Sequence, residues 1–522
     1  MRSIYKTNGS SCLGALWNYA RMLGLLWYFL YGWVVIGLSI YGLHRLWMVW
    51  TYFRCKSIWS SPMDHFDDDQ LPKVTIQLPL YNERHVARRL IRSVAALDYP
   101  IDRMEIQILD DSTDETSEIV AAEVADLKSA GVQIEHIRRS SREGYKAGAL
   151  QYGLERCGGD LVAIFDADFV PNPKLLLNTV HYFTDPEVGL IQTRWGHLNR
   201  SQSLLTRIQA LLLDGHLLIE QTVRNRSGRF FNFNGTAGIW RKTCILEAGG
   251  WEHDTLTEDL DLSYRAQMAG WRFVFLGGLV TPAELPADMN AFKTQQHRWA
   301  KGAVQTCKKL LPRILKSDLP WRIKLEAVFH LTSNFAYLLL ALMAFLIIPD
   351  PKGNPDLTMV LAVHVPIFML ASFSVILFYG VVLHEVGVRW WKWFAYLPLL
   401  IALGIGLSLN NAKAVVEALF NRPSEFTRTP KVGDMKQTRA DNSSSFYLSP
   451  RSWLILVEAL LFLHYAHYTW VAYREALWLS LPFFVLFCFG FGYTACMSLG
   501  AGWNYMDWKK QAVPSKLEAY GI

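Results

Sequence analysis

The sequence is short of charge and of cysteine. Only 19% of its 522 residues are Asp, Glu, Lys or Arg, whereas soluble domains carry about 25%. The seven cysteines are scattered and form no CxxC pair, which excludes a zinc site or a disulfide framework and favours a reducing, cytosolic environment. A net charge of +6 is too mild to indicate nucleic-acid binding, but it suits a protein that lies against an anionic membrane surface.

Several nucleotide and hydrolase motifs are also missing. The chain has no GxGxxG and no GxxxxGK[ST], so a dinucleotide-binding domain and a P-loop lose their main support. It has no HExxH and no GxSxG either, which removes the commonest signs of a zinc protease or a serine hydrolase. Any nucleotide or acyl chemistry must therefore use other groups.

Apolar residues, in contrast, are abundant: 51% of the chain is hydrophobic, and 20 residues are Trp. Long apolar runs occupy 23–44, 328–349, 359–384, 453–473 and 476–506, and only the fourth holds an acidic residue, Glu458. A run of about 20 such residues can cross the hydrocarbon core. The first run offers no small-residue cleavage site, so we expect a retained anchor rather than a signal peptide. The sequence predicts a membrane protein with a soluble insert at 51–320.

The apolar stretch 393–412 is ambiguous, because Pro398, Gly404 and Gly406 interrupt it. Basic residues gather in 421–450 and in 509–516, and such residues favour the cytosolic side. Both segments can share that side with the soluble insert only if 393–412 returns to the side from which it enters. We therefore expect an interfacial or re-entrant helix there and five true spans, with six spans as the alternative.

The soluble insert has the pattern of an α/β domain. Strands are expected at 74–80, 104–111, 132–138 and 160–168, and helices at 83–97, 115–130 and 146–157. Alternation of this kind predicts βαβ units, hence a mainly parallel sheet with helices on both faces. Ligands of such sheets bind beyond the carboxyl ends of the strands. Polar groups follow three of these strands: Tyr81-Asn82-Glu83, Asp110-Asp111 and Asp166-Ala-Asp168.

Two groups of carboxylates could carry chemistry. Asp166 and Asp168 follow an apolar strand, and their oxygens suit Mg²⁺ or Mn²⁺ shared with substrate phosphates; a solvated turn is the alternative. Thr257-Glu258-Asp259 opens a helical pattern, so Thr257 could simply cap that helix. The functional interpretation makes Asp259 a general base for a hydroxyl group.

Cationic and aromatic side chains are further candidates for contact with a substrate. On a helix, Gln295, Arg298 and Trp299 share one face and could serve a diphosphate and a sugar ring, although a helix lying on lipid is the alternative. Lys146 begins a helix and could hold phosphate, or it could be a surface lysine. Trp195 and Trp251 are further candidates for contact with sugar. Gly235 and Gly249-Gly250 indicate tight turns.

Together, and in this order, the motifs PLYNE, DDSTD, YKAGAL, DADF, IQTRW, FNFNGTAGIWRK, LTEDLDL and QQHRW resemble the membrane-integrated family 2 glycosyltransferases with a D, D, D, QxxRW signature. The residues within these motifs are most similar to those of the cellulose synthase-like A and C groups, the mannan and glucan backbone synthases, and of their bacterial relatives. The resemblance covers residues 70–310 and again 421–434. It implies a cytosolic GT-A catalytic domain inserted between transmembrane helices, with amphipathic interfacial helices.

The resemblance implies a role for each matching residue. Donor binding falls to Tyr81, Glu83, Asp110, Asp111, Lys146, Asp166 and Arg194. Asp166 and Asp168 match the DxD that binds Mg²⁺ or Mn²⁺, and Asp259 takes the place of the catalytic base, with Glu258 beside it. The acceptor end and the diphosphate are held by Gln295, Arg298 and Trp299. The stretch 426–431, FTRTPK, looks like the family's gating loop FxVTxK, with Phe426, Arg428, Thr429 and Lys431; Arg428 stands where Val is expected.

The implied domains are an N-terminal region with one span (1–50), a catalytic domain (51–285), interfacial helices (286–325), membrane helices with the interfacial or re-entrant helix (326–420), the gating-like loop (421–450) and a C-terminal pair of spans with a tail (451–522). The catalytic domain would face the cytosol at a plasma, inner or Golgi membrane. Accessory proteins or a homo-oligomer could assist.

We expect an inverting, metal-dependent transfer of hexose from UDP-glucose or GDP-mannose to a growing β-glycan, by default β-1,4-linked, which is extruded across the membrane. Two alternatives remain at this point. One is a non-processive lipid glucosyltransferase of the ceramide type. The other is a transporter with a regulatory nucleotide-binding domain, which the scarcity of charges in the spans disfavours.

Overall fold

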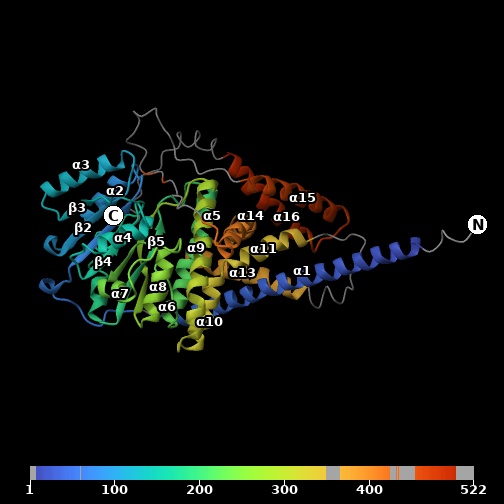
Figure 1. The fold of residues 1–522 in the computed structure, drawn as a ribbon, viewed down its shortest axis with the longest axis horizontal. Coiled ribbons are helices and arrows are strands. Elements are labelled where there is room, and N and C mark those ends of the chain that lie inside the picture. Colours follow the sequence, from blue (N-terminus) through green and yellow to red (C-terminus); the bar gives the residue numbers. More distant parts are fainter. Residues whose placement is uncertain are drawn as a thin grey trace, which may run out of the picture.

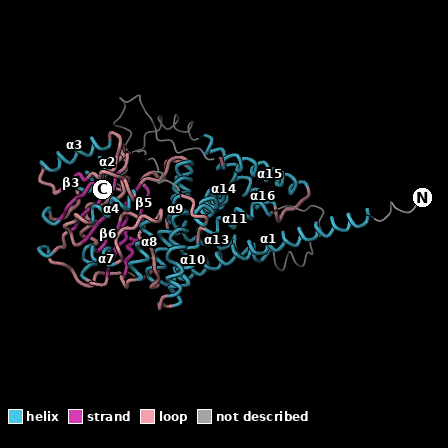
Figure 2. Tube along the Cα trace, viewed as in Figure 1, coloured by secondary structure: helices cyan, strands magenta, loops and turns pink. Residues whose placement is uncertain are grey.

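The computed structural model describes residues 8–58, 60–347, 365–423, 431, 433 and 453–500. Its strands gather at one end of the molecule, and helices make up the other (Figure 2). The helix α9, Met289–Lys316, stands between the two parts (Figure 1). The long helix α1, Asn8–Cys55, extends from the strand-rich part along the other helices toward the N-terminus (Figure 1).

One seven-stranded sheet, ordered β3-β2-β1-β4-β6-β5-β7, forms the centre of the strand-rich part. All neighbouring strands are parallel except at β6, which is antiparallel to both β4 and β5. The expected mainly parallel sheet is therefore confirmed. The strands are β1 Val74–Leu80, β2 Met104–Asp110, β3 Ile134–Ile137, β4 Leu161–Ile164, β5 Val188–His197, β6 Gly238–Arg241 and β7 Arg272–Ala283.

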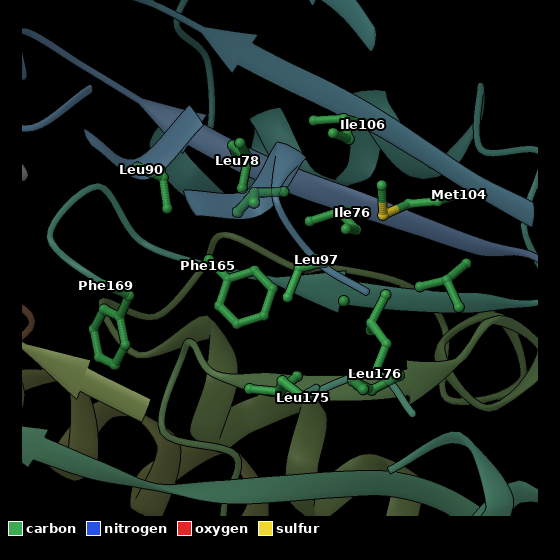
Figure 3. Packing of buried hydrophobic residues seen from close by; sticks show 14 of the residues in the cluster. Ile76, Leu78, Leu90, Leu97, Met104, Ile106, Phe165, Phe169, Leu175 and Leu176 are labelled. Carbon is green, nitrogen blue, oxygen red and sulfur yellow. The ribbon is translucent and has the colours of Figure 1, made fainter. Parts of the chain in front are cut away.

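Helices cover both faces of this sheet. On one face, Ile76 and Leu78 of β1 pack with Ile106 of β2 and with Leu90 of α2 (Figure 3). On the other face, Leu150 of α4 and Leu262 of α8 belong to a second core with strands β4–β7. The covering helices are α2 Ala87–Ala95, α3 Thr116–Ser129, α4 Tyr145–Leu154, α7 Lys242–Glu247 and α8 Glu258–Met268.

The remaining helices form two groups. One follows strand β5, and the other follows α9 and makes up the apolar part of the protein. The first group comprises α5 Leu204–Asp214, a π-helical turn Gly215–Glu220 and α6 Gln221–Arg226. The second comprises α10 Trp321–Thr332, α11 Phe335–Leu346, α13 Val365–Glu385, α14 Trp393–Leu419, α15 Leu454–Arg474 and α16 Leu481–Leu499. Short 3₁₀ turns occupy Asp68–Gln70, Ile101–Arg103, Val180–Thr184 and Trp390–Lys392.

Among the described residues, four helices are long and apolar enough to cross a membrane: Leu26–Cys55, Trp390–Leu419, Leu454–Arg474 and Leu481–Leu499. The pair α10 and α11, bent by 51°, would make a fifth if it forms one span. These helices support the expected membrane protein. The predicted run 328–349 falls on this bent pair, and only part of 359–384 lies within the described residues.

The helix α14, whose role the sequence leaves open, lies between the strand-rich domain and the apolar helices. Its Leu400 and Leu403 pack with Ile208 of α5, whereas its Ile405 packs with Tyr465 of α15. Of the most apolar 18-residue stretch of α14, 72% is buried inside the protein, whereas the corresponding share for α15 is 28%. Length and composition qualify α14 as a span, so the interfacial or re-entrant helix and the total of five spans remain predictions.

Candidate active site

A cavity lies at the carboxyl ends of the central strands, where the sequence predicts the site. Ends of β1, β2, β4, β5 and β7 contribute to it, together with the starts of α4 and α8 and the face of α9. Twelve of the residues predicted for the site line this one cavity: Tyr81, Glu83, Asp111, Lys146, Asp166, Asp168, Glu258, Asp259, Gln295, Arg298, Trp299 and Lys431.

One end of the cavity, beside β1 and β2, is aromatic and cationic. The guanidinium of Arg142 lies 3.3 Å from the ring centre of Tyr81 and 4.9 Å from that of Tyr145. Its Nε atom is buried and has no hydrogen-bond partner among the described residues, and burial lowers the Arg142 pKa. Asp111 is held by Arg139, whose Nε donates to Oδ1 at 3.0 Å. This end therefore offers flat aromatic and guanidinium surfaces together with a cation, Arg142, and an anion, Asp111.

The centre of the cavity holds a lysine among acids. The Lys146 ammonium donates to Asp166 Oδ1 at 2.5 Å and to the Gly235 carbonyl at 2.8 Å. Gly144, just before α4, has a φ of 68°, a conformation that glycine adopts without penalty, and it starts the helix that carries Lys146. Burial alone would lower the Lys146 pKa, but Asp166 and Glu258 raise it above its usual value. Lys146 is therefore cationic and aimed into the cavity.

Asp259 lies in the first turn of α8, beside Glu258. Burial and the neighbouring Glu258 charge raise the pKa of Asp259 to about 7, against the opposing effect of Lys146. One oxygen of Asp259 accepts from the Leu260 amide at 2.8 Å. Thr257 occupies the N-cap position but makes no side-chain cap bond; its hydroxyl lies 3.2 Å from that of Thr306 in α9. A carboxylate with a pKa near neutrality is suited to general base catalysis.

The helix α9 closes the other end of the cavity with Gln295, Arg298 and Trp299. The indole of Trp299 lies 6.5 Å from that of Trp195, and Trp195 packs edge-on against Phe169. Burial lowers the Arg298 pKa, while Glu258, Asp166 and Asp259 oppose that shift. The arrangement places the Arg298 guanidinium near the acids of the cavity and adds two indoles to the lining.

The second acid of the DxD pair contacts the gating-like segment. Lys431 Nζ lies 2.7 Å from Asp168 Oδ2 and 3.1 Å from the Glu284 carbonyl. The Gly433 amide donates to Glu284 Oε2 at 3.2 Å, and Arg89 holds the other oxygen of Glu284 at 2.6 Å. The predicted loop residues Phe426, Arg428 and Thr429 fall outside the described part of the chain.

The structure does not bring two of the predicted donor-binding residues to this cavity. Asp110 is buried at the end of β2, where hydrogen bonds from His136, Ser112 and Ser117 hold its pKa well below the usual range despite burial. Arg194 donates from Nε to the Gly277 carbonyl at 2.8 Å and is not part of the lining. Trp251 is packed in the core rather than facing the cavity, whereas Trp195 lines it.

Sequence reasoning missed Arg142, Tyr145 and Glu284, which all line the cavity. Tyr145 precedes Lys146 in a recognised motif, so its place at the cavity could have been inferred. Arg142 and Glu284 lie outside the motifs for which a role was expected. Their contribution depends on contacts with residues distant in sequence.

The residues present fit a divalent cation. Asp166 and Asp168 offer carboxylate oxygens at the end of β4, the ligands that Mg²⁺ and Mn²⁺ prefer. A second group of carboxylates, from Glu252, Asp254 and Asp261, also converges. That group surrounds Lys309, whose Nζ lies 2.5, 2.7 and 3.0 Å from the three side chains. Lysines also pair with the DxD acids, since Lys146 contacts Asp166 and Lys431 contacts Asp168. The DxD pair is the better candidate because it lines the cavity, whereas Glu252, Asp254 and Asp261 do not.

The family model for glycosyltransferase-like family 2 matches residues 72–302. A glucomannan 4-beta-mannosyltransferase of Cyamopsis tetragonoloba is 36% identical over 415 residues, which cover 76% of either chain. One of Arabidopsis thaliana is 37% identical over 387 residues, covering 72% of this chain and 70% of the relative. A probable glucomannan 4-beta-mannosyltransferase of Oryza sativa is 43% identical over 276 residues, about half of either chain.

Among solved structures, a mannosyltransferase from Pyrobaculum calidifontis, in complex with GDP-Man and Mn2+, aligns with a TM-score of 0.51 at 20% identity. The alignment covers 75% of this chain and all of that one. It supports the GT-A fold of the catalytic domain. With the shared family model and with relatives matched over most of their length, the chain belongs to glycosyltransferase family 2 and, within it, to the cellulose synthase superfamily.

Proposed function

We propose that this enzyme transfers mannose from GDP-mannose to the growing end of a β-glycan, with inversion at the sugar carbon. The observation that carries the proposal is Asp259, a partly buried carboxylate whose pKa is raised to about 7 and which shares one cavity with Lys146, Asp166 and Arg298. A base beside cations and a carboxylate pair is the set of groups that transfer from a sugar diphosphate needs.

The donor has a natural orientation in this cavity. The nucleobase would lie at the end of Tyr81 and Arg142, where a flat surface and polar atoms meet. The diphosphate would then reach Lys146 and, from the α9 side, Arg298. A divalent cation held by Asp166 and Asp168, when bound, would neutralise negative charge on the diphosphate. The sugar carbon would point toward Asp259.

The reaction needs one displacement and no covalent enzyme intermediate. Asp259 takes the proton of the acceptor hydroxyl, whose oxygen forms a bond to the anomeric carbon. The bond from that carbon to the diphosphate oxygen breaks, and its electron pair leaves with the nucleoside diphosphate. Lys146 and Arg298 stabilise the charge that develops there. Because attack and departure occur on opposite sides, an α-linked donor gives a β-linked product.

The acceptor would enter from the α9 side. The indoles of Trp299 and Trp195 lie 6.5 Å apart, and flat aromatic surfaces suit the apolar faces of sugar rings. Gln295 adds an amide that can bond a hydroxyl. Such a site can hold the end of a chain of sugars, which supports repeated transfer. We infer that the catalytic domain faces the cytosol and that the polymer leaves through the apolar helices.

Mannose is favoured because the relatives that match most of this chain are named glucomannan 4-beta-mannosyltransferases. The same names favour a β-1,4 linkage. UDP-glucose is the competing donor, and a lipid acceptor of the ceramide type is the competing acceptor. Each alternative predicts a different product from the same incubation.

The test is a donor screen on the purified full-length protein with Mg²⁺ or Mn²⁺. Radiolabelled GDP-mannose and UDP-glucose are supplied separately, and the products are separated by size and subjected to linkage analysis. A ladder or an insoluble β-1,4-mannan from GDP-mannose supports the proposal. A lipid that carries a single sugar would overturn the proposed polymer product. Incorporation from UDP-glucose alone would overturn the assignment of GDP-mannose as the donor. Protection of the product from an added mannanase in sealed proteoliposomes tests extrusion.

A further inference from the structure

A buried ion pair joins α9, the helix that carries the proposed acceptor residues, to the C-terminal helix α15. Lys293 Nζ, in α9, lies 2.8 and 2.7 Å from the two carboxylate oxygens of Glu458, in α15. The side chains are 6% and 0% exposed, respectively. Glu458 is the one acidic residue of an otherwise uncharged apolar run. An ionisable residue in such a run calls for a functional explanation, with its partner named.

The same part of α9 makes three more hydrogen bonds to the helices behind it. Lys293 Nζ also donates to the Ser498 hydroxyl at 2.7 Å. Asn290 Nδ2 donates to the Ser498 carbonyl at 3.0 Å, and Asn410 Nδ2, in α14, donates to the Lys293 carbonyl at 2.9 Å. All four residues are buried, and they come from α9, α14 and α16. This stretch of α9 is therefore fixed by polar contacts to three helices.

Lys293 and the cavity residues point in different directions from one helix. Side chains two residues apart on an α-helix differ by about 200°, so Gln295 faces away from Lys293. Gln295, Arg298 and Trp299 line the cavity, and Lys293 does not. A rotation of α9 about its axis would break the contacts of Lys293 and move all three cavity side chains at once.

An ion pair of this kind is a poor source of stability, because desolvation of two charges offsets most of their attraction. A pair of apolar side chains would fill the same space. What the ion pair adds is direction: both carboxylate oxygens are bound to one ammonium group, which permits a single rotation and depth of α9. We propose that Lys293 is a positioning residue, whose bond to Glu458 sets the placement of Gln295, Arg298 and Trp299 at the acceptor end of the cavity.

This inference rests on the proposed function, since it requires a saccharide acceptor at α9. The variants are Lys293→Met, Glu458→Gln, the apolar pair Lys293→Met with Glu458→Leu, and the exchanged pair Lys293→Glu with Glu458→Lys. Initial rates are measured with donor and oligosaccharide acceptor varied separately, and nucleoside diphosphate binding is measured by calorimetry. We expect the single variants and the apolar pair to raise the acceptor KM by about tenfold, a modest share of what misplacement of reacting groups can cost.

The donor KM and the affinity for nucleoside diphosphate should change less, by at most about threefold. Arg298 is the α9 residue placed on the diphosphate, whereas Tyr81 and Lys146, which belong to other elements, hold the rest of the donor. The exchanged pair should restore most of the acceptor KM. Arg224→Met is the matched control: it breaks a buried ion pair of Arg224 with Glu326 at 2.9 Å, and it should lower the melting temperature without raising the acceptor KM selectively.

Two results would overturn the inference. One is a wild-type acceptor KM in folded variants that lack the pair; the other is an equal loss at the donor and acceptor ends. If the single variants do not fold, the apolar pair decides, since it keeps the packing and removes the directional bond. Failure of the wild-type protein to extend any saccharide would instead reject the proposed function.

Discussion

The carboxylate of Asp259 lies directly against Gly235. A β-carbon built on Gly235 would come within 3.0 Å of Asp259 Oδ2, and the residue has a φ of 80°. The Gly235 carbonyl also accepts from Lys146. The glycine turn after α6 is therefore part of the wall that sets the position of the base, and a side chain there would push on the carboxylate.

Substitution of Gly235 by Ala should lower the transfer rate by at least about tenfold, because small misplacements of a reacting group are costly. The matched control is Gly228→Ala. Gly228 has a φ of 67°, and no atom of the described residues lies within 4 Å of its β-carbon position. An alanine there carries the backbone strain of about 1–2 kcal/mol without the contact. Steady-state rates and thermal unfolding of both variants separate the two effects. Equal loss of activity in both would contradict this account of Gly235.

The raised pKa of Asp259 predicts a pH dependence. The base must be unprotonated, so kcat/KM should fall as the pH is lowered through about 7, the pKa of Asp259. Because the charge of Glu258 contributes to this rise, Glu258→Gln should move the acid limb of the profile to lower pH. Glu252→Gln, which removes a partly exposed acid bound to Lys309, should leave the limb in place. An acid limb unmoved by Glu258→Gln would argue against Asp259 as the titrating group.

Arg142→Ala should weaken binding of the donor's nucleoside diphosphate by about tenfold. The nucleobase would lose a guanidinium that can stack on its ring, a cation–π contact of about 0.5–2 kcal/mol. The guanidinium covers the ring of Tyr81 at 3.3 Å and lines the cavity. Arg138→Ala provides the control, since Arg138 is about half exposed, bonds the Ser112 carbonyl and does not line the cavity. Calorimetry that finds equal affinities for the two variants would remove Arg142 from the donor site.

Asp168→Asn should reduce Mn²⁺ binding in the presence of nucleoside diphosphate, because the amide is a weaker ligand than the carboxylate. The control is Asp254→Asn, in the acidic group that surrounds Lys309. Electron paramagnetic resonance of free Mn²⁺ measures how much of the ion each variant binds, without reference to activity. Loss of the ion in Asp254→Asn, and not in Asp168→Asn, would move the metal to the other group of carboxylates.

The fold could be predicted where the pattern is regular. The alternation V-T-I-Q-L-P-L predicts a strand at 74–80, and β1 has these bounds. No regular alternation predicts strand β7, since Gly277, Gly278 and Pro282 interrupt it. In the structure, its pairing with β5 is irregular between Thr193 and Arg194, and such irregularities accommodate residues that a regular strand excludes.

The site could be predicted where residues belong to motifs at strand ends. The pair Asp110-Asp111 shows the limit, because neighbouring side chains of a strand point to opposite faces and the sequence does not tell which one meets the cavity. Arg142 reaches the cavity only because the turn before α4 places it over Tyr81. The ion pair of Lys293 with Glu458 joins residues 165 positions apart, a contact that no local pattern encodes.

The central claim is that Asp259 is the general base of a sugar transfer in this cavity. The most direct measurement compares Asp259→Asn with wild type in purified membranes, recording transfer of radiolabelled sugar and binding of the nucleoside diphosphate side by side. The account predicts that transfer is lost, while nucleotide binding stays within about threefold, because the base is not needed to hold the donor. Near-normal turnover by Asp259→Asn would contradict it.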